Sequence, residues 1–291
     1  MGFEIGILFA IGALILWGFG DFFIQRSTRK IGDWETLFII TFFGAIVLTP
    51  FIYKDLIKLF SFNDNGFLIL LIASFVLFIA ALLDFEALKK GKLAIVDSVF
   101  ALEVPVSVIL AFTIIKEKIG LLELSLIVLI VAGLTLISIK SYHLSRRAWI
   151  EKGVFLGILG SIFMGASNFF VGFASRITNP LLTNWFINVF IFLMCTIYLI
   201  FNKKIKKLYN DVKKNRNLML NISTFDNAAW VSFAFAASLA PIAIVVALSE
   251  SYIALAALLG LMINKEKLMK HQKFGLIISL LSAIILAVIY S

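Results

Sequence analysis

The sequence predicts an all-α integral membrane protein of ten transmembrane helices, arranged as two inverted five-helix repeats. Its composition, its ten apolar segments and an internal match between its halves lead to this prediction. Hydrophobic residues make up 62% of the 291 residues and charged residues only 15%, and the mean hydropathy is +1.05. A typical soluble domain has about 25% charged residues. This composition therefore excludes the ordinary soluble classes.

Ten apolar segments follow one another along the chain, and most are long enough for a helix to cross the hydrocarbon core of a membrane, which takes about 20 residues. The connections between them are too short for a soluble domain, and the longest are residues 54–66 and 202–217. The segments are residues 4–25, 34–53, 67–88, 93–115, 120–139, 153–174, 180–201, 218–238, 241–263 and 272–290.

The two halves of the chain match each other at an offset of 147 residues. Residues 4–24 and 151–171 share seven identities in 21 positions, and Glu103 falls on Glu250. Each half holds five segments, so the second half must enter the membrane from the opposite side. We therefore expect two inverted repeats, residues 1–145 and 146–291, with a binding site near the membrane midplane at their interface.

Basic residues are concentrated on one side of this topology. The loops after the odd-numbered segments carry 21 of the 26 Lys and Arg residues. Cytoplasmic loops are enriched in such residues, so both termini are predicted to lie on the non-cytoplasmic side of the cell membrane. The net charge of +9 then indicates topology and contact with anionic lipid in the bilayer, and no nucleic-acid partner is expected.

Two glutamates occupy the middle of long apolar segments, Glu103 in the fourth and Glu250 in the ninth. A carboxylate at that depth costs about 3 kcal/mol or more unless it is compensated. One interpretation is that each is protonated and hydrogen-bonded between helices. The other is that both flank a central path, where they exchange protons or bind a cationic group. Ser107 shares a helix face with Glu103, and small residues around Glu250 allow either close packing or a cavity.

The first and sixth segments place different polar residues at equivalent positions. Trp17 and Asp21 lie one helical turn apart, and so do their counterparts Met164 and Asn168. An acid in one half and an amide in the other can bind opposite ends of a small polar molecule. The alternative for Asp21 is a capping interaction toward Arg26 at the membrane edge. Neighbouring glycines are expected to let these helices approach others closely or bend.

The eighth segment contains Asp226, Asn227 and Trp230. Trp230 lies one turn beyond Asp226, and an aspartate with an indole at that spacing can hold an ammonium group by its charge and by the ring face. The alternative is that Trp230 is a packing residue. Asn227 adds an amide beside this pair, and all three are candidates for substrate binding.

Acids outnumber bases along the expected path. The third segment ends with Asp84 and Glu86, which form either part of this path or an interfacial pair neutralised by nearby lysines. The surplus favours a substrate that bears an amine, or exchange with protons. The acids assigned to the path are Asp21, Asp84, Asp97, Glu103, Asp226 and Glu250.

Motifs for most enzyme classes are missing from the sequence. It contains no GxxxxGK[ST] or GxGxxG loop, no HExxH and no spaced Cys/His set, and its single cysteine is Cys195. ATP hydrolysis, dinucleotide chemistry and a zinc active site therefore lack their usual signals. We expect no cofactor, no metal and no enzymatic activity.

The ten segments in two inverted halves, the Trp17-Gly18 pair, and Glu117 and Glu266 after the fourth segment of each half resemble the drug/metabolite transporter superfamily, in particular its EamA-type members. The resemblance implies a secondary transporter of amino acids, other metabolites or drugs, with a cavity lined by spans 1, 3, 4, 6, 8 and 9. The family has a Gly-Glu dipeptide after the fourth span, whereas Glu117 and Glu266 each follow a lysine in this sequence. The resemblance implies a structural role for this glutamate. Members commonly keep both termini in the cytoplasm, unlike the orientation predicted here.

The predicted function is secondary active transport of small polar metabolites, in particular amine-bearing solutes, by alternating access around Glu103 and Glu250. Protons are a candidate coupling ion, and the chain is expected to act as a monomer or a homodimer. A membrane-embedded enzyme or lipid-handling protein is the first alternative. It is weaker because duplication supplies two equivalent glutamates rather than an acid and a base in distinct settings. A passive channel is the second alternative.

Overall fold

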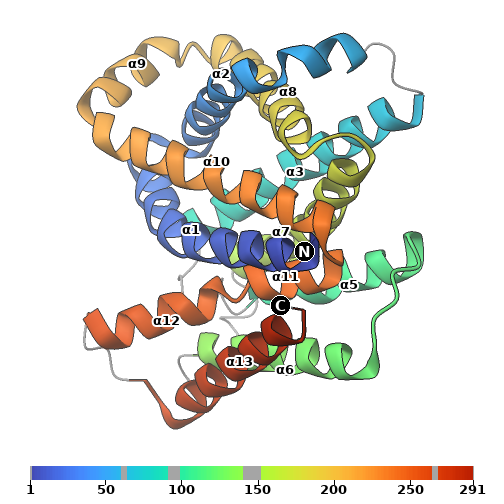
Figure 1. The fold of residues 1–291 in the computed structure, drawn as a ribbon. Helices are drawn as coiled ribbons and strands as arrows, with labels where there is room; N and C mark the ends of the chain where they lie inside the picture. Colours follow the sequence, from blue (N-terminus) through green and yellow to red (C-terminus); the bar gives the residue numbers. More distant parts are fainter. Residues whose placement is uncertain (1, 60–63, 91–98, 140–151, 264–267, 291) are drawn as a thin grey trace.

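The computed structural model describes residues 2–59, 64–90, 99–139, 152–263 and 268–290, and every regular element within these ranges is an α-helix (Figure 1). The helices are α1 (Gly2–Ile31), α2 (Asp33–Leu59), α3 (Asp64–Lys90), α5 (Glu103–Ile114), α6 (Leu121–Ser138), α7 (Lys152–Ile177), α8 (Pro180–Phe201), α9 (Ile205–Lys214), α10 (Arg216–Leu239), α11 (Ile242–Ser249), α12 (Tyr252–Ile263) and α13 (Lys270–Ile289).

Seven helices in the described ranges are long and apolar enough to cross a membrane: α1, α2, α3, α6, α7, α8 and α13. Helix α5 and the α11–α12 segment are apolar but shorter. Helix α10 has 24 residues, which corresponds to about 36 Å, but polar residues such as Asp226 and Asn227 lower its hydropathy. The prediction of an all-α multi-pass membrane protein is confirmed, whereas the number ten and the inverted repeat stay predictions at this point.

Helices from the two halves of the sequence pack against each other in pairs. The most extensive contacts join α1 with α10, α3 with α7, α6 with α13, and α2 with α8, and Figure 1 shows α6 and α13 side by side away from the other pairs. Two glycines bring α6 and α13 close, because a Cβ built on Gly133 would lie 2.7 Å from the carbonyl oxygen of Gly275.

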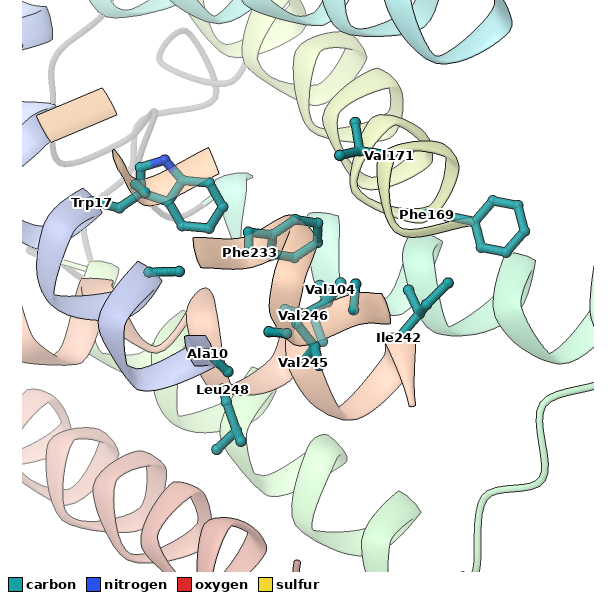
Figure 2. Packing of buried hydrophobic residues seen from close by; sticks show 14 of the residues in the cluster. Ala10, Trp17, Val104, Phe169, Val171, Phe233, Ile242, Val245, Val246 and Leu248 are labelled. Carbon is teal, nitrogen blue, oxygen red and sulfur yellow. The ribbon is translucent and has the colours of Figure 1, made fainter. Parts of the chain in front are cut away.

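Helix α11 lies at the centre of the bundle. All of its residues, 242–249, are buried, as expected for a helix that is apolar on every side. Figure 2 shows Val246 of α11 near Val104 of α5 and Phe233 of α10, with Trp17 of α1 beyond them. The predicted ninth segment therefore begins in the protein interior rather than at a lipid-facing surface.

The ninth segment is divided at Glu250, where a single continuous helix was expected. The Ser249 hydroxyl donates to the carbonyl of Val246 at 3.2 Å, and the Ser251 hydroxyl donates to that of Ala247 at 2.8 Å. Serine hydroxyls that bond to preceding carbonyls compete with the helical hydrogen bonds and bend the helix. The two serines flanking Glu250 weaken the helix there, and α12 continues in another direction (Figure 1).

The fourth segment is also interrupted, at an equivalent place. Val99 and Phe100 are helical, a turn follows, and α5 begins at Glu103. Pro105 explains the interruption, because proline lacks an amide hydrogen and its ring clashes with the carbonyl four residues earlier, that of Ala101. Each break lies at a glutamate, and only the first has a proline beside it.

A short helix that the sequence analysis did not predict, α9, lies in the connection between α8 and α10. It has ten residues, of which Leu208 is buried, and lysines occupy much of the remainder. Its length and charge exclude a membrane-spanning role. An amphipathic helix of this kind is typical of the membrane–water interface.

We expect Gly133→Ala to destabilise the protein by about 1–3 kcal/mol, because the new methyl group overpacks the contact with Gly275 and Ser279. Gly12→Ala is the control, since its Cβ would meet Ser232 Oγ at an ordinary 3.6 Å. Alanine favours a helix over glycine by up to about 1 kcal/mol, so this control is expected to be neutral or stabilising. Thermal unfolding in detergent measures both, and equal melting temperatures would contradict the predicted close crossing.

Candidate functional site

A cavity of about 100 Å³ lies between helices of both halves, at the level of the two helix breaks. Its walls come from α1, α2, α3, α5, α7, α10 and the α11–α12 junction. The cavity was expected to be lined by spans 1, 3, 4, 6, 8 and 9, and the structure adds the second span, α2. The lining residues are Trp17, Ile24, Leu37, Ile40, Ala81, Asp84, Phe85, Phe100, Glu103, Met164, Asn168, Asp226, Trp230, Glu250 and Tyr252.

The cavity is acidic. Asp84, Glu103, Asp226 and Glu250 line it, and its described lining residues include no Lys, Arg or His. Glu103 and Glu250 are each 5% exposed. Glu103 lies in the first turn of α5, whereas Glu250 is the C-cap of α11 and is separated from the first residue of α12 by Ser251. Because the N-terminal end of a helix carries partial positive charge, α5 favours a negative charge on Glu103, and Glu250 gains no such effect from α11.

Helix α7 supplies a polar partner for one of these glutamates. Asn168 Nδ2 donates a hydrogen bond to Glu250 Oε1 at 3.2 Å, and both residues are buried. The structure thus brings together two residues that the sequence analysis assigned to the site from different segments. The side chain of Asp21, at the position equivalent to Asn168, and all of Asp97 lie outside the described part of the structure.

Close contact between α5 and α7 fixes the backbone at Glu103. A Cβ on Gly165 would lie 2.5 Å from the Glu103 carbonyl oxygen, so only glycine fits there. Ser107 Oγ donates to the Gly165 carbonyl at 2.5 Å on the same helix face. The expectation that glycines allow close approach is confirmed at Gly165. Ser107 itself joins two helices and does not line the cavity, which differs from its predicted place in the site.

Aromatic side chains form another wall of the cavity. The rings of Trp17 and Trp230 meet edge to face, with centroids 5.1 Å apart, and both contact Phe233. Asp226 lines the same cavity one turn before Trp230. The structure therefore places the proposed aspartate–indole pair at the cavity, together with the ring of Tyr252.

Asn227 does not line the cavity, contrary to its predicted place there. Its amide nitrogen donates to the carbonyls of Ile40 and Ser223, and its oxygen accepts from Asn188 Nδ2 at 3.0 Å. These bonds join α2, α8 and α10. Asn227 is adjacent to Asp226 in sequence and so points to a different side of α10.

Sequence analysis assigned Asp84 and Glu86 together, but they lie in different environments. Asp84 lines the cavity and its carboxylate packs against Gly160 of α7, whereas Glu86 pairs with Lys89 outside it. Sequence analysis did not assign Met164 or Tyr252 to the site. Met164 had a detectable signal, because it is the counterpart of Trp17 at the offset of 147 residues.

A second, polar cavity of about 610 Å³, which we call the vestibule, lies at the ends of α1, α3 and α8 that lead into basic loops. Thr28 of the vestibule is one turn beyond Ile24 of the acidic cavity, and Trp34 is three residues before Leu37. The two cavities are therefore about one helical turn apart along shared helices. The vestibule is lined by Thr28, Arg29, Lys30, Ile31, Gly32, Asp33, Trp34, Glu35, Leu82, Glu86, Lys89, Tyr198, Lys204 and Lys207.

Ion pairs hold the acids of the vestibule. Lys89 Nζ lies 3.1 Å from Asp33 and 3.5 Å from Glu86, and Lys204 Nζ lies 3.1 Å from Glu35. Burial lowers the pKa of Lys89, but its hydrogen bond to Asp33 and the neighbouring negative charges raise it above the usual value. Burial likewise lowers the pKa of Lys204, and its hydrogen bond to Glu35 outweighs this effect. Both lysines therefore stay charged near neutral pH.

Metal binding finds no support in the described part of the chain, where no three His, Cys, Asp or Glu side chains are grouped to hold an ion. What the acidic cavity can do is hold a cationic group against carboxylates and ring faces. Its desolvated acids can also exchange protons with a solute or with water.

A family model of known proteins matches the chain twice. The model of the EamA-like transporter family covers residues 4–139 and again residues 151–288. The chain belongs to the EamA-like transporter family. This family of membrane transporters lies in the drug/metabolite transporter superfamily, so the resemblance noted in the sequence is confirmed.

Other comparisons bear on the fold of this EamA-like chain. No curated protein matches it. Chains of solved structures do match, 29 in number. One of them, described only as "Crystal structure of protein", has a TM-score of 0.71 at 13% sequence identity, over 98% of this chain and 96% of that chain. At that identity the likeness shows the fold alone.

The glutamate that follows the fourth span in EamA-like proteins closes the side of the bundle opposite the vestibule. Glu117 accepts hydrogen bonds from the amides of Ile242 and Ala243, at 2.9 and 3.0 Å, and thereby caps the N-terminus of α11. Arg176 Nη2 lies 3.0 Å from Glu117 and also donates to the carbonyl of Ala240. Glu117 thus has a structural position, as the resemblance implied. Its counterpart Glu266 lies outside the described residues.

Glu117→Ala is expected to destabilise the protein by on the order of 2 kcal/mol, because it leaves two helix amides and the Arg176 guanidinium without their carboxylate. Glu123→Ala is a matched control, since Glu123 accepts a single 3.3 Å hydrogen bond from Tyr290. The control is expected to cost about 0.5–1 kcal/mol. Unfolding in detergent compares the two, and an equal loss would show that the cap contributes little.

Proposed function

We propose that this protein is a secondary active transporter of small polar solutes that carry an amine, and that it works by alternating access around the acidic cavity. The proposal rests on one observation: two interrupted helices each place a buried glutamate, Glu103 and Glu250, at the same cavity. Interrupted helices with a binding site at the break are typical of secondary transporters.

Two inverted five-helix repeats, residues 1–145 and 146–291, underlie the proposed mechanism. The twofold match of the family model supports a duplication. The helix pairs support a twofold relation between the halves, because exchanging the halves converts the α1–α10 pair into the α7–α3 pair and leaves α2–α8 and α6–α13 unchanged as pairs. Five spans in each half make this relation an inverted one. In this arrangement α10 is the eighth span, and α11 with α12 forms the ninth. Rocking of one repeat against the other then exposes the cavity to each side in turn.

The proposed substrate class follows from charge and size. Carboxylates with nearby indole and phenol rings favour an ammonium group over an anion. Pockets for drug-sized ligands measure about 300–1,000 Å³, so a cavity of about 100 Å³ suits a solute of few non-hydrogen atoms or must widen for a larger one. Proton exchange at Glu103 and Glu250 is the proposed form of coupling.

In this conformation, solute would reach the acidic cavity from the side of the membrane that carries the basic loops. The vestibule lies within about one turn of the cavity, whereas the Glu117–Arg176 contact joins α5, α7 and α10 on the other side. Basic loops mark the cytoplasmic side. We therefore propose that the structure corresponds to a state with its access on the cytoplasmic side, and that opening the other side separates Glu117 from Arg176.

Glu103→Gln and Glu250→Gln are expected to lower transport in proteoliposomes by about 10–100-fold, the effect of losing one charge-assisted hydrogen bond. The measurement is counterflow of labelled solute across a panel of amines, amino acids and nucleosides, repeated at several pH values. Glu123→Gln removes an acid that lies outside the cavity and is the control. Wild-type counterflow in both glutamate variants would remove their proposed role.

The same assay separates the alternatives. Recovery of a chemically altered product would indicate a membrane-embedded enzyme. Flux of unaltered solute without counterflow would indicate a passive channel. Transport of amine-bearing members alone would support the proposed substrate class.

Both termini are proposed to be non-cytoplasmic, and cysteine labelling tests this orientation. Cys195 is buried, so the chain offers a low background for single cysteines. A membrane-impermeant maleimide on intact cells is expected to label Lys118→Cys at once and Lys206→Cys only after permeabilisation. The reverse order would place the termini in the cytoplasm, the orientation common in the family.

A further inference from the structure

The vestibule contains more positive charge than its own acids neutralise. It is lined by five basic and three acidic residues. The acids lie on α2 and α3, and Lys89 and Lys204 pair with all three of them. Lys204 is also held over the ring of Tyr198, at 5.1 Å from the centroid. These two lysines therefore serve the protein's own carboxylates.

The remaining cations lie together on the side of the vestibule formed by α1 and α9. They are Arg29, Lys30 and Lys207. Among the described residues, Arg29 and Lys207 make no ion pair, and Lys30 Nζ donates at 3.0 Å to the neutral amide of Asn215. This bond attaches the end of α1 to the junction of α9 and α10. Three positive charges thus face one polar cavity without a described acid to balance them.

Helix α9 exposes an apolar face on the side away from the vestibule. Ile205 and Tyr209 are 50% and 69% exposed and lie one turn apart, whereas Lys207 lies on the opposite side of the helix. Buried Leu208 packs α9 against the protein. A helix with an outward apolar face is typical of the membrane–water interface, so the vestibule lies at the level of lipid headgroups. Basic pockets at the ends of membrane helices bind the headgroups of anionic lipids.

We propose that the α1–α9 side of the vestibule binds the phosphate headgroup of an anionic phospholipid, with Arg29, Lys30 and Lys207 as its ligands. The acyl chains then extend into the surrounding bilayer. The bound phosphate neutralises the surplus charge and joins α1 to α9. The α2–α3 side of the vestibule, with its paired acids, stays accessible to solute. This proposal does not depend on the proposed transport function.

The test is a thermal-shift titration of the purified full-length protein in neutral detergent with short-chain phosphatidylglycerol, with phosphatidylcholine and inorganic phosphate as comparison probes. Wild type is expected to show a saturable rise in melting temperature with phosphatidylglycerol alone. The double variant R29Q/K207Q is expected to need roughly 30-fold more of this lipid, the effect of removing two cations near an anionic headgroup.

The matched control is K213Q/K214Q, which removes two positive charges from α9 at positions that do not line the vestibule. It is expected to respond as wild type does. An equal loss in both double variants would overturn the proposal in favour of general attraction to a basic surface. A full shift with inorganic phosphate at the same concentration would overturn the lipid assignment and indicate a free-anion site.

Discussion

The structure depends on how two carboxylates are accommodated in the middle of a membrane protein. An uncompensated charge at that depth costs several kcal/mol, yet Glu103 and Glu250 are both almost fully buried. Both glutamates lie where the helix that carries them is interrupted. Glu103 is at the positive end of α5, and α7 supplies the Asn168 amide to Glu250. Both breaks also contribute to the wall of the cavity.

This constraint explains why the most tightly packed residues surround the site. The backbone at Glu103 stays in place because Gly165 lets α7 contact it and Ser107 bonds across. Helix α11 is positioned by Glu117, which caps it from the first half of the chain. The proposed alternating-access movement needs rigid elements whose contacts change only at defined places. The Glu117–Arg176 pair joins elements of both halves, so it is the contact that the proposed movement would break.

Much of this arrangement could be predicted from the sequence, and the failures have physical causes. Hydropathy gave the helical membrane class and the seven helices that are long and apolar enough to span, because burial in lipid imposes a strong signal on composition. The break at Glu103 had a signal in Pro105, which hydropathy ignores. The break at Glu250 had no such signal, because serines that bond to preceding carbonyls also lie inside unbroken helices, as Ser74 does in α3. Asn227 was misplaced because neighbours in sequence face different sides of a helix.

The vestibule contains both lysines that pair with acids and cations that do not, and both kinds lie beside basic loops. Basic loops are typical of the cytoplasmic side of membrane proteins, so lysines at the ends of spans do not by themselves indicate a site. What distinguishes a site is geometry. Lys89 and Lys204 are held by carboxylates, whereas Arg29 and Lys207 line the vestibule and make no ion pair with a described acid. Charge that is needed only for topology can lie anywhere on this face. Charge that converges on a polar cavity from two helices, which Lys30 and Asn215 hold together, is arranged to contact a ligand.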